Sequence, residues 1–239
     1  MYQNKTVSIV FATYREKKSI KKIVDNFFRT GFVDQVIVVD NNAENGTLEE
    51  VAKTKATLIT EKKQGYGYAY QKGIKHATGD FVVLCEPDGS YSASDLERFL
   101  VYAKDGFDAV LGSRTGQSTP LSGADITLLR KFANVIEAKT VEVLFNTNAL
   151  TDVGCTYKLF TLKNLKKLSR QWVRKDSIFA TELLLLTVTN NMKFIEIPIT
   201  FKKRIGRSSL TDSNYKLVKW GITIQMYIFK FWLRRFFKG

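Results

Sequence analysis

Histidine and cysteine are scarce in this chain of 239 residues, and their scarcity excludes several chemistries. His76 is the only histidine, which excludes multi-histidine metal sites and argues against a Ser-His-Asp triad. The two cysteines, Cys85 and Cys155, lack CxxC spacing. Their separation excludes a zinc ribbon and a disulfide framework, and it fits a reducing compartment.

Long apolar runs are also missing from the sequence. No stretch of 18 or more apolar residues occurs, so we expect no membrane-spanning helix. The opening Gln3-Asn4-Lys5 leads directly into a strand-like run, so we expect no signal peptide. Hydrophobic residues make up 44% and charged residues 25%, which is typical of a globular protein.

The basic excess of the chain is unevenly placed. The net charge is +14. Residues 151–239 hold 18 Lys and Arg against 5 Asp and Glu, whereas residues 1–150 hold 19 against 18. This asymmetry indicates an anionic partner, either nucleic acid, a membrane surface or a phosphorylated ligand. The alternative is a solvated basic face that favours solubility.

The first half alternates buried strand-like runs with helical spacing. We predict strands at 7–12, 35–40, 56–60, 81–85 and 109–112, and helices at 17–28, 66–77 and 92–104. Thr47-x-x-Glu50 resembles a capping box that opens a short helix. The order predicts an α/β fold with a doubly wound, parallel sheet. Ligands bind at the carboxyl ends of such strands, which here present Thr13, Tyr14, Glu16, Asp40, Asn41, Glu86, Asp88, Ser113 and Arg114.

The second half is less regular. We predict a loop at 115–125, helices at 126–146 and 182–189, and strands at 155–160 and 194–201, with Pro198 indicating an edge strand. A helix at 213–238 mixes Trp and Phe side chains with Lys and Arg. That composition fits either a position among lipid headgroups or packing against the catalytic domain with a basic outer face.

Glu86-Pro87-Asp88 carries the sharpest chemical signal. Two carboxylates directly after a buried strand can share one Mg²⁺ or Mn²⁺, and these ions usually keep phosphate oxygens among their ligands. The alternative is a turn whose acids cap the next helix.

Three weaker motifs also have more than one interpretation each. Gly65 and Gly67, at a helix entry, allow close approach of an anion or form a plain turn. The basic segment 202–209 can wrap a phosphate, or it is a solvated loop or a nucleic-acid patch. Asp152 could position or deprotonate an acceptor, or it is a turn aspartate.

Taken in order, these segments resemble family 2 glycosyltransferases of GT-A fold. VSIVFATYRE, QVIVVDNNAENGT, QGYGYAYQKGIKHATGDFVVLCEPDGSY, VLGSR, TDVGCTYKLF and the run from ELLLL to GRSSL carry the resemblance, which covers about residues 6–210. The most similar subgroup is that of the dolichol- or polyprenyl-phosphate mannosyl and glucosyl transferases. It implies inverting transfer of a hexose from a UDP- or GDP-linked sugar to a polyprenyl phosphate, with Mg²⁺ or Mn²⁺.

The resemblance also implies a role for each matching residue. Ala12, Tyr14 and Glu16 would line the nucleoside pocket, Asp40 would bind the base or ribose, and Gly65 and Gly67 would pass near the nucleotide. Glu86 and Asp88 would hold the metal, and Arg114 would face the donor. Asp152 would lie near the acceptor, whose phosphate would meet Arg130, Arg204 and Ser208.

Three positions depart from the family pattern. Glu86 replaces an aspartate of the metal motif, Asn41 replaces a common second aspartate after Asp40, and Ser209 replaces a frequent lysine. These departures bear on metal geometry, on base choice and on recognition of the acceptor phosphate.

The expected organisation is a catalytic domain over 1–210, with a nucleotide-sugar half at 1–114 and an acceptor half at 115–210. Residues 211–239 would form a helix on the membrane surface, which implies a peripheral protein of the cytoplasmic face that works in cell-envelope biosynthesis. The oligomeric state stays open, a homodimer included.

The residues also bear on functions other than this transfer. A sugar hydroxyl could be the acceptor, with Asp152 as base. A nucleic-acid-binding protein is disfavoured because the acidic rim of Asp40, Glu86 and Asp88 would repel phosphate. A nucleotidyltransferase should show a glycine-rich loop after the first strand, which is absent. A catalytically inactive nucleotide-binding protein stays open because of Glu86.

Overall fold

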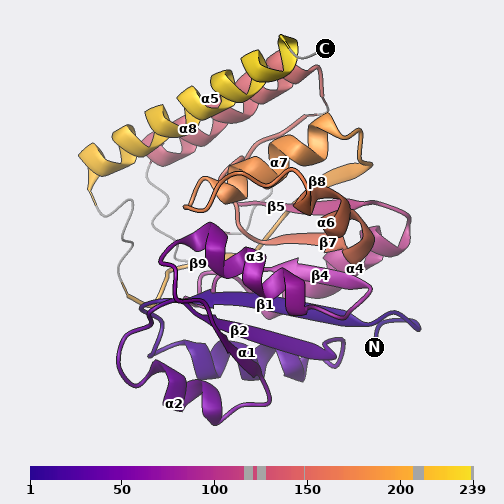
Figure 1. The fold of residues 1–239 in the computed structure, drawn as a ribbon, viewed down its shortest axis with the longest axis vertical. Coiled ribbons are helices and arrows are strands. Elements are labelled where there is room, and N and C mark those ends of the chain that lie inside the picture. Colours follow the sequence, from indigo (N-terminus) through magenta and orange to yellow (C-terminus); the bar gives the residue numbers. More distant parts are fainter. Residues whose placement is uncertain (116–120, 123–127, 148, 207–212, 238–239) are drawn as a thin grey trace.

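The computed structural model describes residues 1–115, 121–122, 128–147, 149–206 and 213–237. A central sheet divides the described part of the chain into two layers of helices (Figure 1). One face of the sheet packs on α1 (Ile20–Arg29), α2 (Thr47–Ala52) and, after a 3-10 turn at Ala93–Asp95, α4 (Leu96–Lys104). The other face packs on α3 (Tyr66–His76), α6 (Leu162–Ser169) and α7 (Phe179–Thr189).

The sheet is mostly parallel. Its seven strands follow the order β3 (Thr57–Thr60), β2 (Gln35–Asp40), β1 (Val7–Thr13), β4 (Phe81–Leu84), β7 (Lys158–Thr161), β5 (Ala109–Ser113) and β8 (Phe194–Pro198). Only β7 is antiparallel to its neighbours, β4 and β5. A second, two-stranded sheet pairs β6 (Leu121–Ser122) with β9 (Phe201–Lys202). The carboxyl ends of β1, β2, β4 and β5 therefore meet at one edge.

Most of the predicted elements are confirmed, and the exceptions have local causes. The five strands of the first half form where predicted. β1, β2, β4 and β5 do so because their runs are buried on both faces, whereas β3 is a mostly exposed edge strand. The capping box is wrong: Gly46, with a φ of +88°, precedes α2, and the buried Thr47 hydroxyl has no hydrogen-bond partner among the residues that the structure describes. The predicted strand 155–160 begins only at Lys158, and 194–201 divides into β8 and β9. Pro198 does lie on an edge strand.

Two long helices, α5 (Leu128–Phe145) and α8 (Asn214–Phe236), lie side by side beyond α7 (Figure 1). Leu217, Ile224 and Ile228 of α8 are buried in the same core as α7. The opposite side of α8 exposes large apolar side chains, so one face packs on the domain and the other faces outward. Within the described residues, no helix has the length and apolarity needed to cross a membrane.

Candidate active site

A large cavity opens where the strands end, between the sheet and the α5–α8 pair. Its volume is about 1260 Å³, which exceeds the roughly 300–1,000 Å³ of a typical small-molecule site. Of the predicted site residues, those that line it are Ala12, Tyr14, Glu16, Gly65, Glu86, Asp88, Arg114, Arg130 and Arg204. Asp40, Gly67 and Asp152 lie outside the lining, and Ser208 lies outside the described residues.

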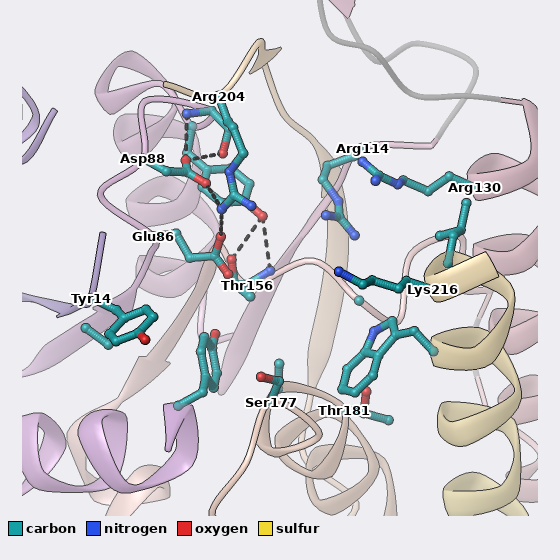
Figure 2. A pocket seen from close by; sticks show the side chains of 18 of the residues that line it. Tyr14, Glu86, Asp88, Arg114, Arg130, Thr156, Ser177, Thr181, Arg204 and Lys216 are labelled. Carbon is teal, nitrogen blue, oxygen red and sulfur yellow. Dashed lines mark hydrogen bonds and ion pairs between the residues drawn. The ribbon is translucent and has the colours of Figure 1, made fainter. Parts of the chain in front are cut away.

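Glu86 and Asp88 lie directly after β4 and are bridged by Arg204 (Figure 2). The Arg204 Nη2 group donates to Glu86 Oε2 at 3.1 Å and also to Asp88 Oδ2. The backbone holds this contact, because Ile205 N donates to Asp88 O at 2.7 Å and Lys202 N donates to Ser90 O at 2.8 Å. The segment 202–205 thus covers the carboxylate pair.

The electrostatics of this pair favour a bound cation. Burial and the neighbouring Asp88 raise the pKa of Glu86 to about 7, and the Arg204 guanidinium partly opposes that rise. Two close carboxylates stay ionised together only when a positive charge compensates them. Arg204 supplies that charge in this structure, and a divalent ion would use the same oxygens.

The donor set fits Mg²⁺ or Mn²⁺. Both ions prefer carboxylate oxygens and complete their shells with water and phosphate oxygens. Among the described residues, no group of three or more His, Cys, Asp or Glu side chains could enclose a metal. Two carboxylates at the edge of an open cavity therefore suit an ion that is shared with a diphosphate.

The loop after β1 forms one wall of the cavity. The Glu16 carboxylate holds this loop in its conformation, because its Oε2 accepts hydrogen bonds from Tyr14 N at 2.6 Å and from Arg15 N at 2.8 Å. Tyr14 is left partly exposed on the cavity wall, opposite Arg130 and Lys216 (Figure 2). Asp40 instead holds the turn after β2, where its Oδ1 accepts from Ala43 N at 2.9 Å.

Asn41 is a cavity residue whose amide organises the neighbouring loop. Its Nδ2 donates to the carbonyl oxygens of Glu61 and Lys63, both at 2.8 Å. Its Oδ1 accepts from Gly65 N at 2.9 Å. An aspartate has no N–H to donate, so the departure from the family pattern at this position has a structural reason in this chain.

Gly65 and Gly67 make room for another part of the chain. A Cβ at Gly65 would lie 2.5 Å from Lys175 O, and one at Gly67 would lie 2.8 Å from Lys175 Cα. Both distances are shorter than real Cβ contacts. The two glycines therefore let the segment before α7 approach α3, and only Gly65 also reaches the cavity.

Arg114 and Asp152 form a buried, bidentate ion pair beside the cavity. Arg114 Nε donates to Asp152 Oδ2 at 2.7 Å, and Nη2 donates to Oδ1 at 2.8 Å. The same carboxylate also accepts from Asn134 Nδ2 and Gly154 N. Despite its burial, the Arg114 guanidinium lowers the pKa of Asp152. This geometry favours a role in positioning Arg114, since a base needs a free oxygen and a higher pKa.

Cations from three elements line the far side of the cavity. Figure 2 shows Arg114, Arg130 and Lys216, which come from the end of β5, from α5 and from α8. Burial and the nearby guanidinium groups of Arg114 and Arg204 lower the pKa of Arg130. Such a concentration of positive charge is suited to a phosphate.

Glu137 and Lys216 are cavity residues that the sequence did not predict, whereas Asn41, predicted at the rim of the strand ends, does line the cavity. Arg130, Asn134 and Glu137 follow one another at helical spacing along α5, so their common face could have been predicted once Arg130 was assigned to the site. Lys216 carried no such signal, because its place depends on how α8 docks.

A mostly parallel sheet with a carboxylate pair at the end of β4 is the arrangement of GT-A transferases, which use nucleotide sugars. The chain belongs to the family described as glycosyl transferase family 2, whose model matches residues 8–155. The protein is therefore a glycosyltransferase.

Curated relatives are similar over most of the chain. A dolichyl-phosphate hexose transferase of Haloferax volcanii is 25% identical, with 85% of this chain and 86% of the relative covered. A polyprenol monophosphomannose synthase of Mycolicibacterium smegmatis is also 25% identical, with 90% and 86% covered. The glycosyltransferase AglJ of Haloferax volcanii is 24% identical, with 92% and 71% covered.

Solved structures support the fold. Glucosyl-3-phosphoglycerate synthase of Mycobacterium tuberculosis in complex with UDP superposes with a TM-score of 0.73 at 14% identity, with 95% of this chain and 80% of that chain covered. The same enzyme in complex with Mn²⁺ and UDP-glucose gives a TM-score of 0.71 at 16% identity, with 94% and 79% covered. The likeness covers a larger share of the chain than residues 8–155, which the family model matches.

Proposed function

We propose that the protein transfers a hexose from a UDP- or GDP-linked sugar to a polyprenyl phosphate, with inversion at the anomeric carbon. The bond from the anomeric carbon to the donor diphosphate breaks, a bond to an acceptor phosphate oxygen forms, and the nucleoside diphosphate leaves. The observation that carries the proposal is one cavity with a carboxylate pair on one side and Arg114, Arg130 and Lys216 on the other. The names of the relatives, a dolichyl-phosphate hexose transferase among them, support the acceptor class.

Each side of the cavity has its own task in this proposal. Glu86 and Asp88 would hold Mg²⁺ or Mn²⁺, which would neutralise charge that develops on the leaving diphosphate. Arg204, released from the carboxylates when the ion binds, would turn to the same diphosphate. Ala12, Tyr14 and Glu16 would receive the nucleoside, with Asp40 and the two glycines Gly65 and Gly67 holding the surrounding loops.

The acceptor phosphate needs to be positioned in the cavity more than it needs a base. A phosphate monoester has a second pKa of about 6, so its oxygen is already anionic near neutral pH. Arg130, together with Ser208, would orient it, and Asp152 would act by fixing Arg114. A sugar-hydroxyl acceptor would require a base, and the carboxylate of Asp152 is fully engaged with hydrogen-bond donors.

Donor binding is expected to depend on the divalent ion. A nucleoside diphosphate sugar at one hundred times its Kd stabilises a protein by about 2.7 kcal/mol, which is a rise in Tm of roughly 5–10 °C for a chain of this size. We expect this rise with Mn²⁺ and UDP- or GDP-sugar, and its loss with EDTA, in a thermal-shift titration. An equal rise in EDTA would contradict the metal site.

We further propose that α5 and α8 rest on a membrane surface. Both helices expose large apolar side chains on their outer faces, namely Leu128, Leu129, Phe132, Ile136 and Val143 on α5 and Val218, Ile222, Met226, Phe229, Leu233 and Phe236 on α8. Lys219, Lys230 and Arg234 flank the apolar side of α8. Apolar side chains next to cations suit anionic lipid headgroups, so the proposed location is peripheral, on the cytoplasmic face of the membrane. Residues 211–239 would thus serve both the domain and the lipid.

Replacing Phe229 by Glu is expected to weaken vesicle binding by roughly ten- to one-hundred-fold, because a burial worth about 1.5–3 kcal/mol is lost. Val101→Glu on α4 is the matched control, since Val101 is 43% exposed and Phe229 is 44% exposed. Co-sedimentation with phosphatidylglycerol vesicles measures both. Equal binding by the two variants would contradict the proposed membrane face. Removal of α8 is unsuitable as a test, because the helix contributes Leu217, Ile224 and Ile228 to the core.

A further inference from the structure

One end of the cavity is a recess between α5 and α8. The two helices run alongside each other there, with Gly221 opposite Ala133 and Glu137. Arg130 and Lys216 line the cavity one to two turns nearer the start of each helix. The remaining lining residues of the two helices, apart from Glu137, are apolar or neutral, namely Ala133, Asn134, Asn214, Leu217, Trp220, Gly221 and Ile224.

Glu137 is the exception in this recess. Its side chain lines the cavity, yet the residue is only 3% exposed. Its Oε2 atom is buried, and among the described residues it has no hydrogen-bond partner. A buried polar group without a partner is costly to the folded protein. A ligand group that hydrogen-bonds to this carboxyl would remove that cost.

The surroundings keep the Glu137 carboxyl neutral. Burial and the carboxylate of Asp152 raise the pKa of Glu137 to about 8, and Arg114 only partly opposes this. The other groups that face the recess are Arg130 on the same helix and Lys216 on α8, while α7 presents the uncharged Ala180 and Thr181. At neutral pH the carboxyl therefore carries an O–H that can be donated.

We propose that Glu137 binds the acceptor, by donating its carboxyl O–H to the phosphomonoester in a subsite that α5 and α8 build together. This inference rests on the proposed function. It adds Glu137 to the acceptor site, and it gives α8 a second role besides membrane contact, as part of that site. A phosphate dianion suits this recess. The cations attract it and a protonated Glu137 can donate to it, whereas an ionised carboxylate would repel it. The recess also adjoins the two helices whose outer faces we assign to lipid, from which a lipid phosphate would arrive.

The first test compares Glu137→Gln with Glu137→Leu. Gln keeps an N–H donor at every pH, whereas Leu has none. In calorimetric titrations with a ten-carbon polyprenyl phosphate, the Leu variant is expected to bind about ten- to one-hundred-fold more weakly, and the Gln variant within a few-fold of wild type. Glu142→Gln, the same change further along α5, is the matched control.

The pH dependence separates a binding role from a structural one. Acceptor affinity of the wild-type protein is expected to fall above pH 8, as Glu137 loses its proton, and that of Glu137→Gln is expected to stay level. The Kd for the nucleoside diphosphate sugar should be the same for wild type and Glu137→Gln. Parallel profiles for wild type and Glu137→Gln would overturn the proposal, as would an equal loss of donor and acceptor binding in Glu137→Leu.

Gly221→Ala gives an independent test that leaves Glu137 intact. The added Cβ would lie 3.5 Å from Glu137 Oε1 and 3.9 Å from the Ala133 Cβ, which are ordinary contacts. Alanine is also the better helix former, so the variant should fold. We expect acceptor binding to weaken several-fold because the methyl group narrows the recess, and unchanged acceptor binding would count against the subsite.

These outcomes separate the two proposals. If the wild-type protein binds the nucleoside diphosphate sugar but no polyprenyl phosphate, the proposed acceptor is wrong and the subsite falls with it. If the wild-type protein binds the phosphate and Glu137→Leu binds it equally well, only the role of Glu137 is wrong. Binding of inorganic phosphate as tightly as of the polyprenyl phosphate would show that the lipid chain adds no affinity, which would contradict the proposed acceptor and not the role of Glu137.

Discussion

Asp88→Asn is expected to lower kcat/KM by about a thousand-fold, with the fold intact. A divalent ion held by Asp88 would supply several kcal/mol of charge stabilisation on the leaving diphosphate, and each 1.36 kcal/mol corresponds to about tenfold in rate. Asparagine keeps an oxygen that can accept from Ser90 N, which is bonded to Asp88 Oδ1 at 2.8 Å. It removes the negative charge that the ion needs.

Steady-state turnover in saturating Mn²⁺ and the Tm of the same sample measure the two parts of this prediction. Asp25→Asn is the control, because Asp25 forms only a surface pair with Lys21. Turnover of Asp88→Asn within tenfold of wild type would contradict a metal ligand at this position. A fall in Tm of more than a few degrees would instead assign Asp88 to the stability of the turn after β4.

Asp152→Asn is expected to destabilise the folded protein by about 3–5 kcal/mol, the usual cost of breaking a buried ion pair from one side. The Asp152 side chain is fully buried and that of Arg114 is 16% exposed, so the unpaired guanidinium could not reach water without moving. Urea unfolding at pH 7 measures the loss. The double variant Arg114→Met with Asp152→Asn should recover part of it, since no buried charge is left unpaired.

The pH dependence of this stability has a definite sign. Because the folded protein lowers the pKa of Asp152, the contribution of the ion pair is complete above the unfolded pKa of about 3.9. It is lost as the pH falls through the lower folded value. The stability difference between wild type and Asp152→Asn should therefore be constant from pH 5 to 7 and shrink below about pH 4. A difference that grows on acidification would contradict the ion pair.

The first half of the fold could be predicted from the sequence because its signals are local. QVIVVD and FVVL are continuous apolar runs, and such runs form strands that are buried on both faces. The carboxylate pair after β4 followed from the rule that ligands bind at strand ends. The direction of β7 could not be predicted, because only its neighbours β4 and β5 determine it.

The composition of the site depended on contacts between distant segments. Arg204 meets Asp88 across 116 positions, and Lys216 joins the cavity only because α8 docks on α5. Both sides of α8 are apolar, so the sequence left open whether it packs on the domain or lies on lipid. The buried Leu217, Ile224 and Ile228 identify the inner face, and part of the +13 charge of residues 151–239 lies in the cavity and along the outer flank of α8.

The most direct test of the proposed reaction is transfer of radiolabelled hexose from UDP- and GDP-sugars, with Mn²⁺, to a short-chain polyprenyl phosphate and to the matching polyprenyl alcohol. The account predicts a labelled lipid product from the phosphate with at least one donor, none from the alcohol, and none when EDTA replaces Mn²⁺. Equal transfer to the alcohol, or transfer to a sugar hydroxyl while the phosphate stays unlabelled, would contradict it.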